Sequence, residues 1–197
     1  MPDIDQYLRA ATSLRVNRSG GVSPHKPCLF LAIIDLYDAT PDRENRINFD
    51  PVLIERYLRY FSAVRKDKDS PNPHLPFFHL RSDGFWHLIA TPGHQQTLDR
   101  TSTVTSSGKL HELVSHAELD GELHDLLKHQ QSRTLLAQAL VNHWFDRDQD
   151  EMDRLVGTSH QINLYERRLR STAPTQMIGE AKPPAFVRDP AFRRVVL

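Results

Sequence analysis

Apolar residues recur at helical spacing through the first third of the chain. Those in residues 4–14 predict a short amphipathic helix. The run after Pro27 is apolar on nearly all sides, and proline suits the first turn of a helix, so a central buried helix is expected there. Asp50 and Pro51 are typical of a helix start, and the apolar stripe that follows predicts a third helix ending near Val64.

The pattern changes after a charged, proline-bearing loop at residues 65–73. Two β-prone runs, residues 77–81 and 85–90, flank the turn sequence Ser82-Asp83-Gly84 and predict a β-hairpin. Leucine-rich segments between residues 110 and 141 predict two or three further helices. No internal repeat is visible.

These elements predict an α+β fold, a mostly helical single domain with a small antiparallel sheet or hairpin. A chain of 197 residues is long enough for one core and a tail. We place the domain at residues 1–157. Periodicity weakens afterwards and prolines accumulate, so residues 158–197 are expected to form a linker or basic arm.

Total charge is uninformative, because 25 basic residues balance 25 acidic ones. Their distribution along the chain is uneven. Residues 6–34 contain no Asp or Glu but include Arg9, Arg15, Arg18 and Lys26. A neutral protein with one basic face can still bind phosphates.

Other classes find little support. The longest apolar run, residues 28–34, is far shorter than the roughly 20 residues that cross a bilayer, and the N-terminus has no export signal, so we expect a cytoplasmic protein without a membrane partner. Cys28 is the only cysteine, which excludes an internal disulfide and a multi-cysteine zinc site. Its expected role is that of a buried core thiol.

Eleven histidines invite a metal or catalytic interpretation, above all His74, His79 and His87. Neither a cysteine nor a close carboxylate pair completes a metal-ligand set around them, and the nucleophile motif G-x-S-x-G is absent. We therefore predict no catalytic residue, no metal and no cofactor in this chain.

Two segments are more specific. In Ser23-Pro24-His25-Lys26-Pro27 a loop of small residues opens onto a helix start, which offers backbone N–H groups and positive charge to a phosphate, although an ordinary proline-marked helix start has the same pattern. In Leu75-Pro76-Phe77-Phe78-His79 apolar surface stands near Arg81, although a core strand would also fit.

Together these segments resemble a known family. Pro24-His25-Lys26-Pro27, a leucine-rich helix, and about fifty residues later Pro-Phe-aromatic-His-Leu-Arg-x-Asp-Gly-x-Trp resemble the sulfur-binding domain of phosphorothioate-dependent type IV restriction endonucleases. The similarity covers roughly residues 4–156. Residues 186–197 resemble the lead-in to the HNH nuclease domain of these enzymes, whose metal-binding cysteines and histidines are missing here.

The resemblance implies a partner and a set of contacts. The partner is duplex DNA in which sulfur replaces a non-bridging phosphate oxygen, and the domain targets a restriction endonuclease in bacterial defence. A homodimer through the full-length protein is compatible with this interpretation. Residues lining the sulfur pocket would be Leu75, Pro76, His79, His25 and Lys26, where relatives often have an aromatic residue in place of Leu75 and a smaller one in place of His79. Residues contacting the DNA would be Arg18, Ser19, Ser23, Pro24, Phe78 and Arg81.

Physical chemistry supports the same interpretation, and two alternatives stay open. Sulfur is poorly hydrated, so an apolar pocket accepts it at little cost, whereas a phosphate oxygen would lose water at a cost of about 1–3 kcal/mol. One alternative is a reader of methylated bases with an aromatic cage near Phe77, Phe78 and Trp86. The other is a protein-interaction or dimerisation domain that uses residues 75–79.

Overall fold

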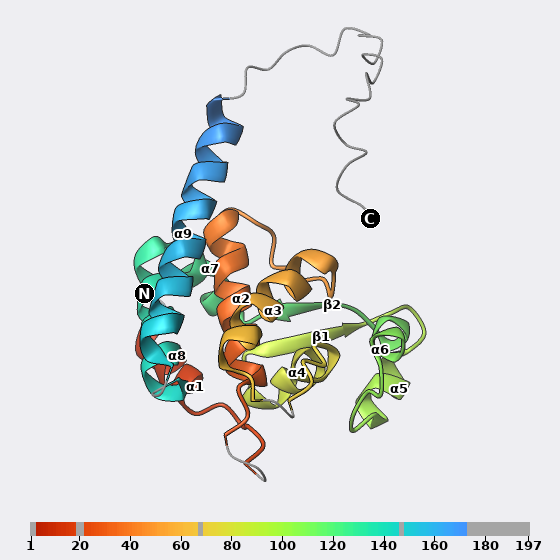
Figure 1. Cartoon of the computed structure of the whole chain (residues 1–197). Coiled ribbons are helices and arrows are strands. Elements are labelled where there is room, and N and C mark those ends of the chain that lie inside the picture. The colour runs from red at the N-terminus through yellow and green to blue at the C-terminus, as the bar shows by residue number, and fades with distance from the viewer. Residues whose placement is uncertain (1–2, 19–21, 67–68, 146–147, 173–197) are drawn as a thin grey trace, which may run out of the picture.

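Helix α2 (His25–Ala39) runs through the centre of the protein, and all of its residues from Lys26 to Ala39 are buried. We describe the protein from a computed structural model, which covers residues 3–18, 22–66, 69–145 and 148–172. Figure 1 shows α2 enclosed by other elements. The prediction of a central buried helix is confirmed, and so is the buried thiol of Cys28, which is 0% exposed.

The remaining long helices pack around α2 and one another. Helices α3, α7, α8 and α9 contact α2, and α1 packs on α8. Their bounds are α1 Ile4–Thr12, α3 Pro51–Val64, α7 Gly121–Lys128, α8 Gln130–Trp144 and α9 Gln149–Thr172. Asp50 caps α3 by accepting the N–H of Leu53 at 2.9 Å, and Pro51 occupies the first turn, as the sequence predicts.

The sheet of the described residues has two antiparallel strands, β1 (Trp86–Ala90) and β2 (Val114–Leu119). Trp86 pairs with Leu119, and the register shifts by a bulge near Ala90. Helices α5 (Gln95–Arg100) and α6 (Ser107–Leu113) lie in the connection between the strands, at one end of the sheet (Figure 1). The predicted class, a mostly helical α+β domain with a small antiparallel sheet, is therefore confirmed.

The predicted hairpin is wrong. Residues 77–81, its expected first strand, are helical, and the expected second strand pairs with a different segment of the chain. Residues His74–His79 form helix α4 and Leu80–Asp83 a 3₁₀ turn, after which Gly84 enters the left-handed region with φ +89° and β1 begins. Strand β1 pairs instead with β2, a segment whose leucines suggested a helix. The core explains the helix, because Phe77, Phe78 and Leu80 are all 0% exposed, and α4 and the 3₁₀ turn together bury them.

Helix α9 passes through the predicted domain boundary. The linker or basic arm is expected to begin at residue 158, whereas the helix continues to Thr172. Hydrophobic periodicity is weak here because two of the residues that α9 buries, Ser159 and Asn163, are polar. Together with Met152 they are 0–2% exposed. The rest of the arm, residues 173–197, lies outside the described residues, and the division into two domains stays a prediction.

The described part of the chain contains no helix that is long and apolar enough to cross a membrane.

Candidate nucleic-acid interface

A hollow of about 470 Å³ opens where the start of α2 meets α4 and the segment before α2. It brings together residues that are far apart in the sequence. The residues that line it are Arg15, Val16, Asn17, Ser23, His25, Lys26, Leu75, Pro76, His79, Ser82 and Thr103. None of these lining residues is acidic, so the opening is suited to an anion.

The apolar wall of the hollow comes from α4. Leu75 is half-buried and Pro76 is buried, and both line the opening. The next two residues, Phe77 and Phe78, point into the core, where Phe77 packs edge-on against Trp86. The indole N–H of Trp86 donates to the carbonyl of Phe77 at 2.9 Å. This anchoring fixes α4 and so presents its first turn to the hollow.

Below the opening lies a buried ion pair. Lys26 Nζ is 2.6 Å from Asp83 Oδ2 and donates to Ser82 Oγ at 2.9 Å. The other oxygen of Asp83 accepts the backbone N–H of Arg15 at 2.7 Å. Burial lowers the pKa of Lys26, and the bond to Asp83 partly offsets that effect. One carboxylate thus connects α2, the 3₁₀ turn and the segment that carries Arg15.

His25 is held at both ring nitrogens. Nε2 lies 3.0 Å from the carbonyl oxygen of Ser70, and Nδ1 lies 2.8 Å from Ser23 Oγ. A carbonyl only accepts, so Nε2 carries a hydrogen and donates it to Ser70. The ring also packs on Phe61 at a centroid distance of 4.7 Å. These contacts fix the orientation of His25 at the rim.

His79, from the same helix as the apolar wall, supplies a polar group to the lining of the hollow. Its Nε2 lies 3.0 Å from Thr103 Oγ1, a residue of the loop between α5 and α6. Burial lowers the pKa of the imidazole, and the positive charges of Lys26 and Arg81 lower it further. The neutral form of His79 is therefore favoured at neutral pH.

All five pocket residues suggested by the resemblance come together. Leu75, Pro76, His79, His25 and Lys26 all line the hollow, as does Ser23 from the set expected to contact DNA. Two more of that set, Arg18 and Pro24, line a second hollow of about 430 Å³ that shares the loop before α2. Ser19 lies outside the described residues.

Two predicted DNA contacts, Phe78 and Arg81, make contacts within the domain. Phe78 is 0% exposed, so its prediction as a surface contact is wrong, because the ring is needed in the core. The guanidinium of Arg81 lies 4.0 Å from the centre of that ring and donates to the carbonyl of Thr101 at 2.5 Å and of Leu98 at 3.4 Å. Arg81 thereby holds the loop that carries Thr103 against α4.

Sequence reasoning did not identify the remaining lining residues, Arg15, Val16, Asn17, Ser82 and Thr103. The sequence could have indicated Arg15 as a site residue, since it belongs to the acid-free basic stretch near the N-terminus. Nothing in the sequence indicates Thr103, because it reaches the hollow only through the packing of the α5–α6 loop on α4.

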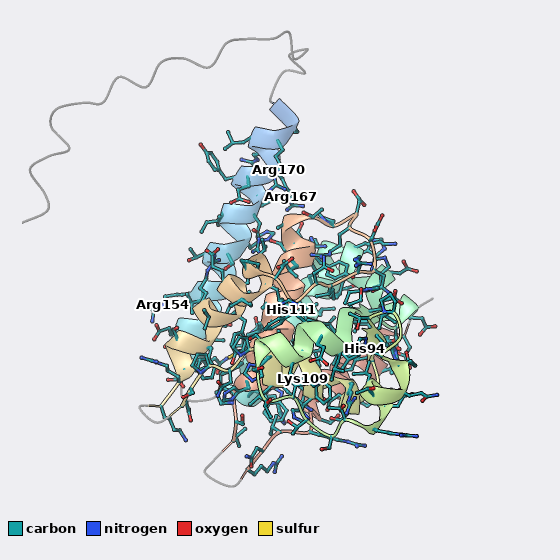
Figure 2. The ribbon with its side chains drawn as sticks, turned by 90° about the vertical axis from the view of Figure 1, so that its right-hand side faces the viewer. His94, Lys109, His111, Arg154, Arg167 and Arg170 are labelled. Carbon is teal, nitrogen blue, oxygen red and sulfur yellow. The ribbon has the colours of Figure 1, made fainter. Side chains whose placement is uncertain are left out.

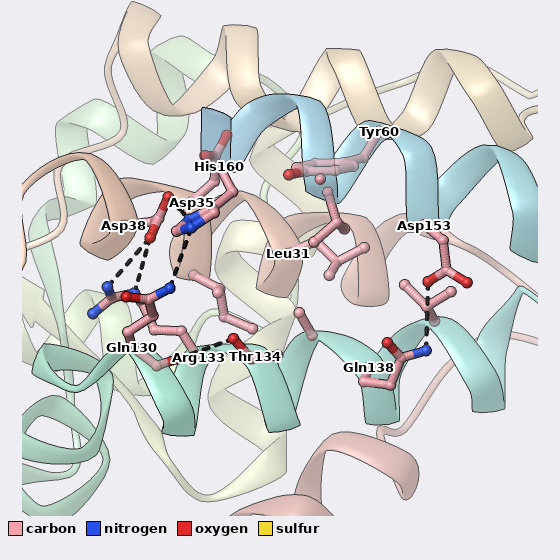
Figure 3. A pocket seen from close by; sticks show the side chains of 15 residues that line it. Leu31, Asp35, Asp38, Tyr60, Gln130, Arg133, Thr134, Gln138, Asp153 and His160 are labelled. Atoms are coloured by element: carbon pink, nitrogen blue, oxygen red, sulfur yellow. Dashed lines mark hydrogen bonds and ion pairs between the residues drawn. The ribbon is translucent and has the colours of Figure 1, made fainter. Parts of the chain in front are cut away.

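A third hollow, with a volume of about 190 Å³, lies elsewhere, between α2, α8 and α9 (Figure 3). Its polar groups bind one another: Asp38 accepts from Arg133 at 3.3 Å and lies 2.9 Å from His160 Nδ1. The walls are otherwise largely apolar, from residues such as Leu31 and Val156. This hollow lies where α9 packs against α2 and α8. None of the predicted site residues lines it.

Basic side chains also occur away from the hollow, on α6 and α9 (Figure 2). Several of them are neutralised within their own helix. Lys109 lies 2.8 Å from Glu112, and Arg170 lies 3.3 Å from Glu166. The residues that line the hollow, by contrast, include no acidic residue.

A mostly helical domain with an apolar hollow bordered by cations is compatible with binding to a nucleic-acid backbone. The comparison with protein families is specific on this point, since the model described as "ScoMcrA-like, DNA sulfur-binding domain" matches residues 4–160. The chain belongs to this family, and it is a DNA-binding domain rather than a catalytic one. A search among curated proteins found no match.

Proposed function

We propose that the hollow binds the sulfur of a phosphorothioate linkage in duplex DNA, with Leu75 and Pro76 against the sulfur atom. The observation that carries the proposal is the meeting of this apolar wall with Arg15, His25 and Lys26 in one acid-free opening. A modified backbone offers the matching combination, a poorly hydrated atom next to a negative charge.

The apolar wall accounts for selectivity. Sulfur gives up little hydration when it leaves water, so burying it against Leu75 and Pro76 costs little. An oxygen in the same place would lose its water without gaining a donor from that wall, at a cost of about 1–3 kcal/mol. This corresponds to an affinity for the unmodified duplex that is about ten- to a hundred-fold lower.

The basic residues account for general affinity. Arg15 is exposed at the rim and is free of an acidic neighbour among the lining residues, whereas Lys26 is neutralised by Asp83. We therefore assign the direct phosphate contact mainly to Arg15, whereas both ring nitrogens of His25 are bound to Ser70 and Ser23. In this proposal Lys26 supports the floor of the site, and binding requires neither a metal nor a cofactor.

In the cell, the domain would direct a nuclease to modified DNA. We propose that it is the targeting module of a type IV restriction endonuclease with an HNH catalytic domain, which acts in bacterial defence. We place the nuclease beyond residue 197, and a homodimer of that full-length protein belongs to the same proposal.

The test is a titration of the whole chain with matched duplexes. One has no sulfur, and the other two carry a single sulfur in either stereochemical configuration at the same linkage. Only one configuration points the sulfur into the hollow, so we expect tight binding of one duplex and about ten- to a hundred-fold weaker binding of the others. Equal binding of all three duplexes would refute the proposal.

Of the alternatives, the methylated-base reader has the least support from the described residues. Its proposed cage, Phe77, Phe78 and Trp86, is 0–1% exposed and so presents no open aromatic face. A duplex that is methylated but lacks sulfur separates the two functions, because it should bind no better than the unmodified duplex. The interaction alternative predicts a mass that rises with concentration and no response to DNA.

A further inference from the structure

His79 introduces a titratable group beside the apolar wall on which the proposed selectivity depends. The side chain lines the same hollow as Leu75 and Pro76. Its ring is fixed from two sides, by the hydrogen bond of Nε2 to Thr103 and by the edge-on contact with Phe78 at a centroid distance of 5.3 Å. A fixed imidazole at this place influences any atom that enters.

The charges around His79 are mostly positive. From α2 it faces Lys26 and, across the hollow, His25, while the 3₁₀ turn contributes Arg81 and Asp83. The only carboxylate of this group, Asp83, is already bound to Lys26 at 2.6 Å. The segment before α2 adds Arg15, and Thr103 from the α5–α6 loop has no charge. Burial and these cations together lower the pKa of His79.

We infer that His79 sets how strongly the site prefers sulfur to oxygen, and that this preference decreases when the ring takes up a proton. The inference rests on the proposed function and concerns the regulation of that site. It names a specificity-determining residue whose effect varies with pH.

The chemistry follows from the two states of the ring. The neutral imidazole has no charge, and Thr103 occupies one of its nitrogens, so the ring offers an unmodified phosphate at most one uncharged donor to replace its lost water. The imidazolium has two N–H donors and a positive charge. A phosphate oxygen accepts a strong, charge-assisted hydrogen bond, whereas sulfur is a weaker acceptor and gains less. Acid therefore strengthens binding of the unmodified duplex more than binding of the modified one.

The test measures dissociation constants for the sulfur duplex and its unmodified match from about pH 7.5 to about pH 5.5 at constant ionic strength. For the wild-type chain we expect the ratio of the two constants to fall by about ten-fold toward acid. His79→Gln keeps a partner for Thr103 but takes up no proton, so its ratio should stay constant within about two-fold. His129→Ala, a change at an exposed histidine between α7 and α8, should behave like the wild type.

A second measurement does not depend on a variant. The ring protons of His79, followed by NMR in the free protein, should titrate below the ordinary pKa of about 6.5. A constant ratio in the wild type, or the same fall in His79→Gln, would overturn the inference while leaving the proposed function intact. A lack of preference for sulfur at every pH would instead count against the proposed function itself.

Discussion

Lys26 Nζ lies 2.6 Å from Asp83 Oδ2, and the two side chains are only 8% and 4% exposed. The pair joins the first turn of α2 to the 3₁₀ turn after α4, directly below the hollow. Its position explains how residues separated by more than fifty positions form one opening. A buried pair of this kind is costly to break, because the remaining partner keeps its charge without compensation.

Replacing one member of this pair should destabilise the domain strongly. Lys26→Met leaves Asp83 charged and buried, and we expect a loss of about 3–5 kcal/mol in the free energy of unfolding, measured by urea denaturation. The double variant Lys26→Met/Asp83→Asn should recover part of that loss. Arg9→Met is the control, because the Arg9–Asp3 pair is exposed and should contribute at most about 1 kcal/mol. A loss for Lys26→Met no larger than this would show that the pair is not buried in solution.

Arg15 should determine part of the salt dependence of DNA binding. If its guanidinium neutralises one phosphate, Arg15→Ala should reduce the slope of log affinity against log salt by about 0.9 for modified and unmodified duplexes alike. Arg9→Ala, at an exposed arginine of α1, should leave the slope unchanged. An unaltered slope in Arg15→Ala would place the DNA backbone away from this side of the hollow.

Leu75 should determine selectivity rather than general affinity. Leu75→Asn places an amide donor on the apolar wall, so the unmodified phosphate gains a partner and the preference for sulfur should fall by about ten-fold. Leu135→Asn, at a 44% exposed leucine of α8, is the matched control. Competition between modified and unmodified duplexes measures the preference directly. If both variants keep the wild-type preference, the sulfur does not contact Leu75.

Two glycines should respond to alanine in opposite directions. Gly157 lies inside α9, and an added Cβ would meet no atom within 4 Å, so Gly157→Ala should stabilise the protein by about 1 kcal/mol. Gly84 has φ +89°, a conformation that strains a residue with a Cβ, so Gly84→Ala should destabilise it by about 1–3 kcal/mol. Thermal unfolding followed by circular dichroism reports both effects. Stabilisation by Gly84→Ala would mean that the turn into β1 differs from the one described.

The helices with strong local signals were predictable. Residues 4–14, the run after Pro27 and the capped segment from Asp50 each contain periodicity or a start signal that needs no distant partner. The segment around Pro76 contains no such local signal. Its aromatic residues suit a strand or a buried helix equally well, and burial of Phe77 and Phe78 in the core favoured the helix.

The candidate site likewise combines residues that the sequence indicates with residues that only the packing of distant segments brings in. The two motifs could be identified from their order along the chain, and the resemblance suggested which of their residues face the DNA. Identifying Thr103, or the pairing of Lys26 with Asp83, requires knowing that the α5–α6 loop and the 3₁₀ turn pack beside α2. Phe78 was misplaced because only packing shows which face of α4 is covered.

The sequence by itself determined the helical character of the domain, the buried central helix and the two segments that form the site, since these depend on neighbours within a few residues. Only the tertiary structure decided the partner of β1, the helical continuation of α9 to Thr172 and the set of side chains around the hollow. Contacts between distant segments are fixed by the shape and charge complementarity of whole elements, and no local pattern encodes them.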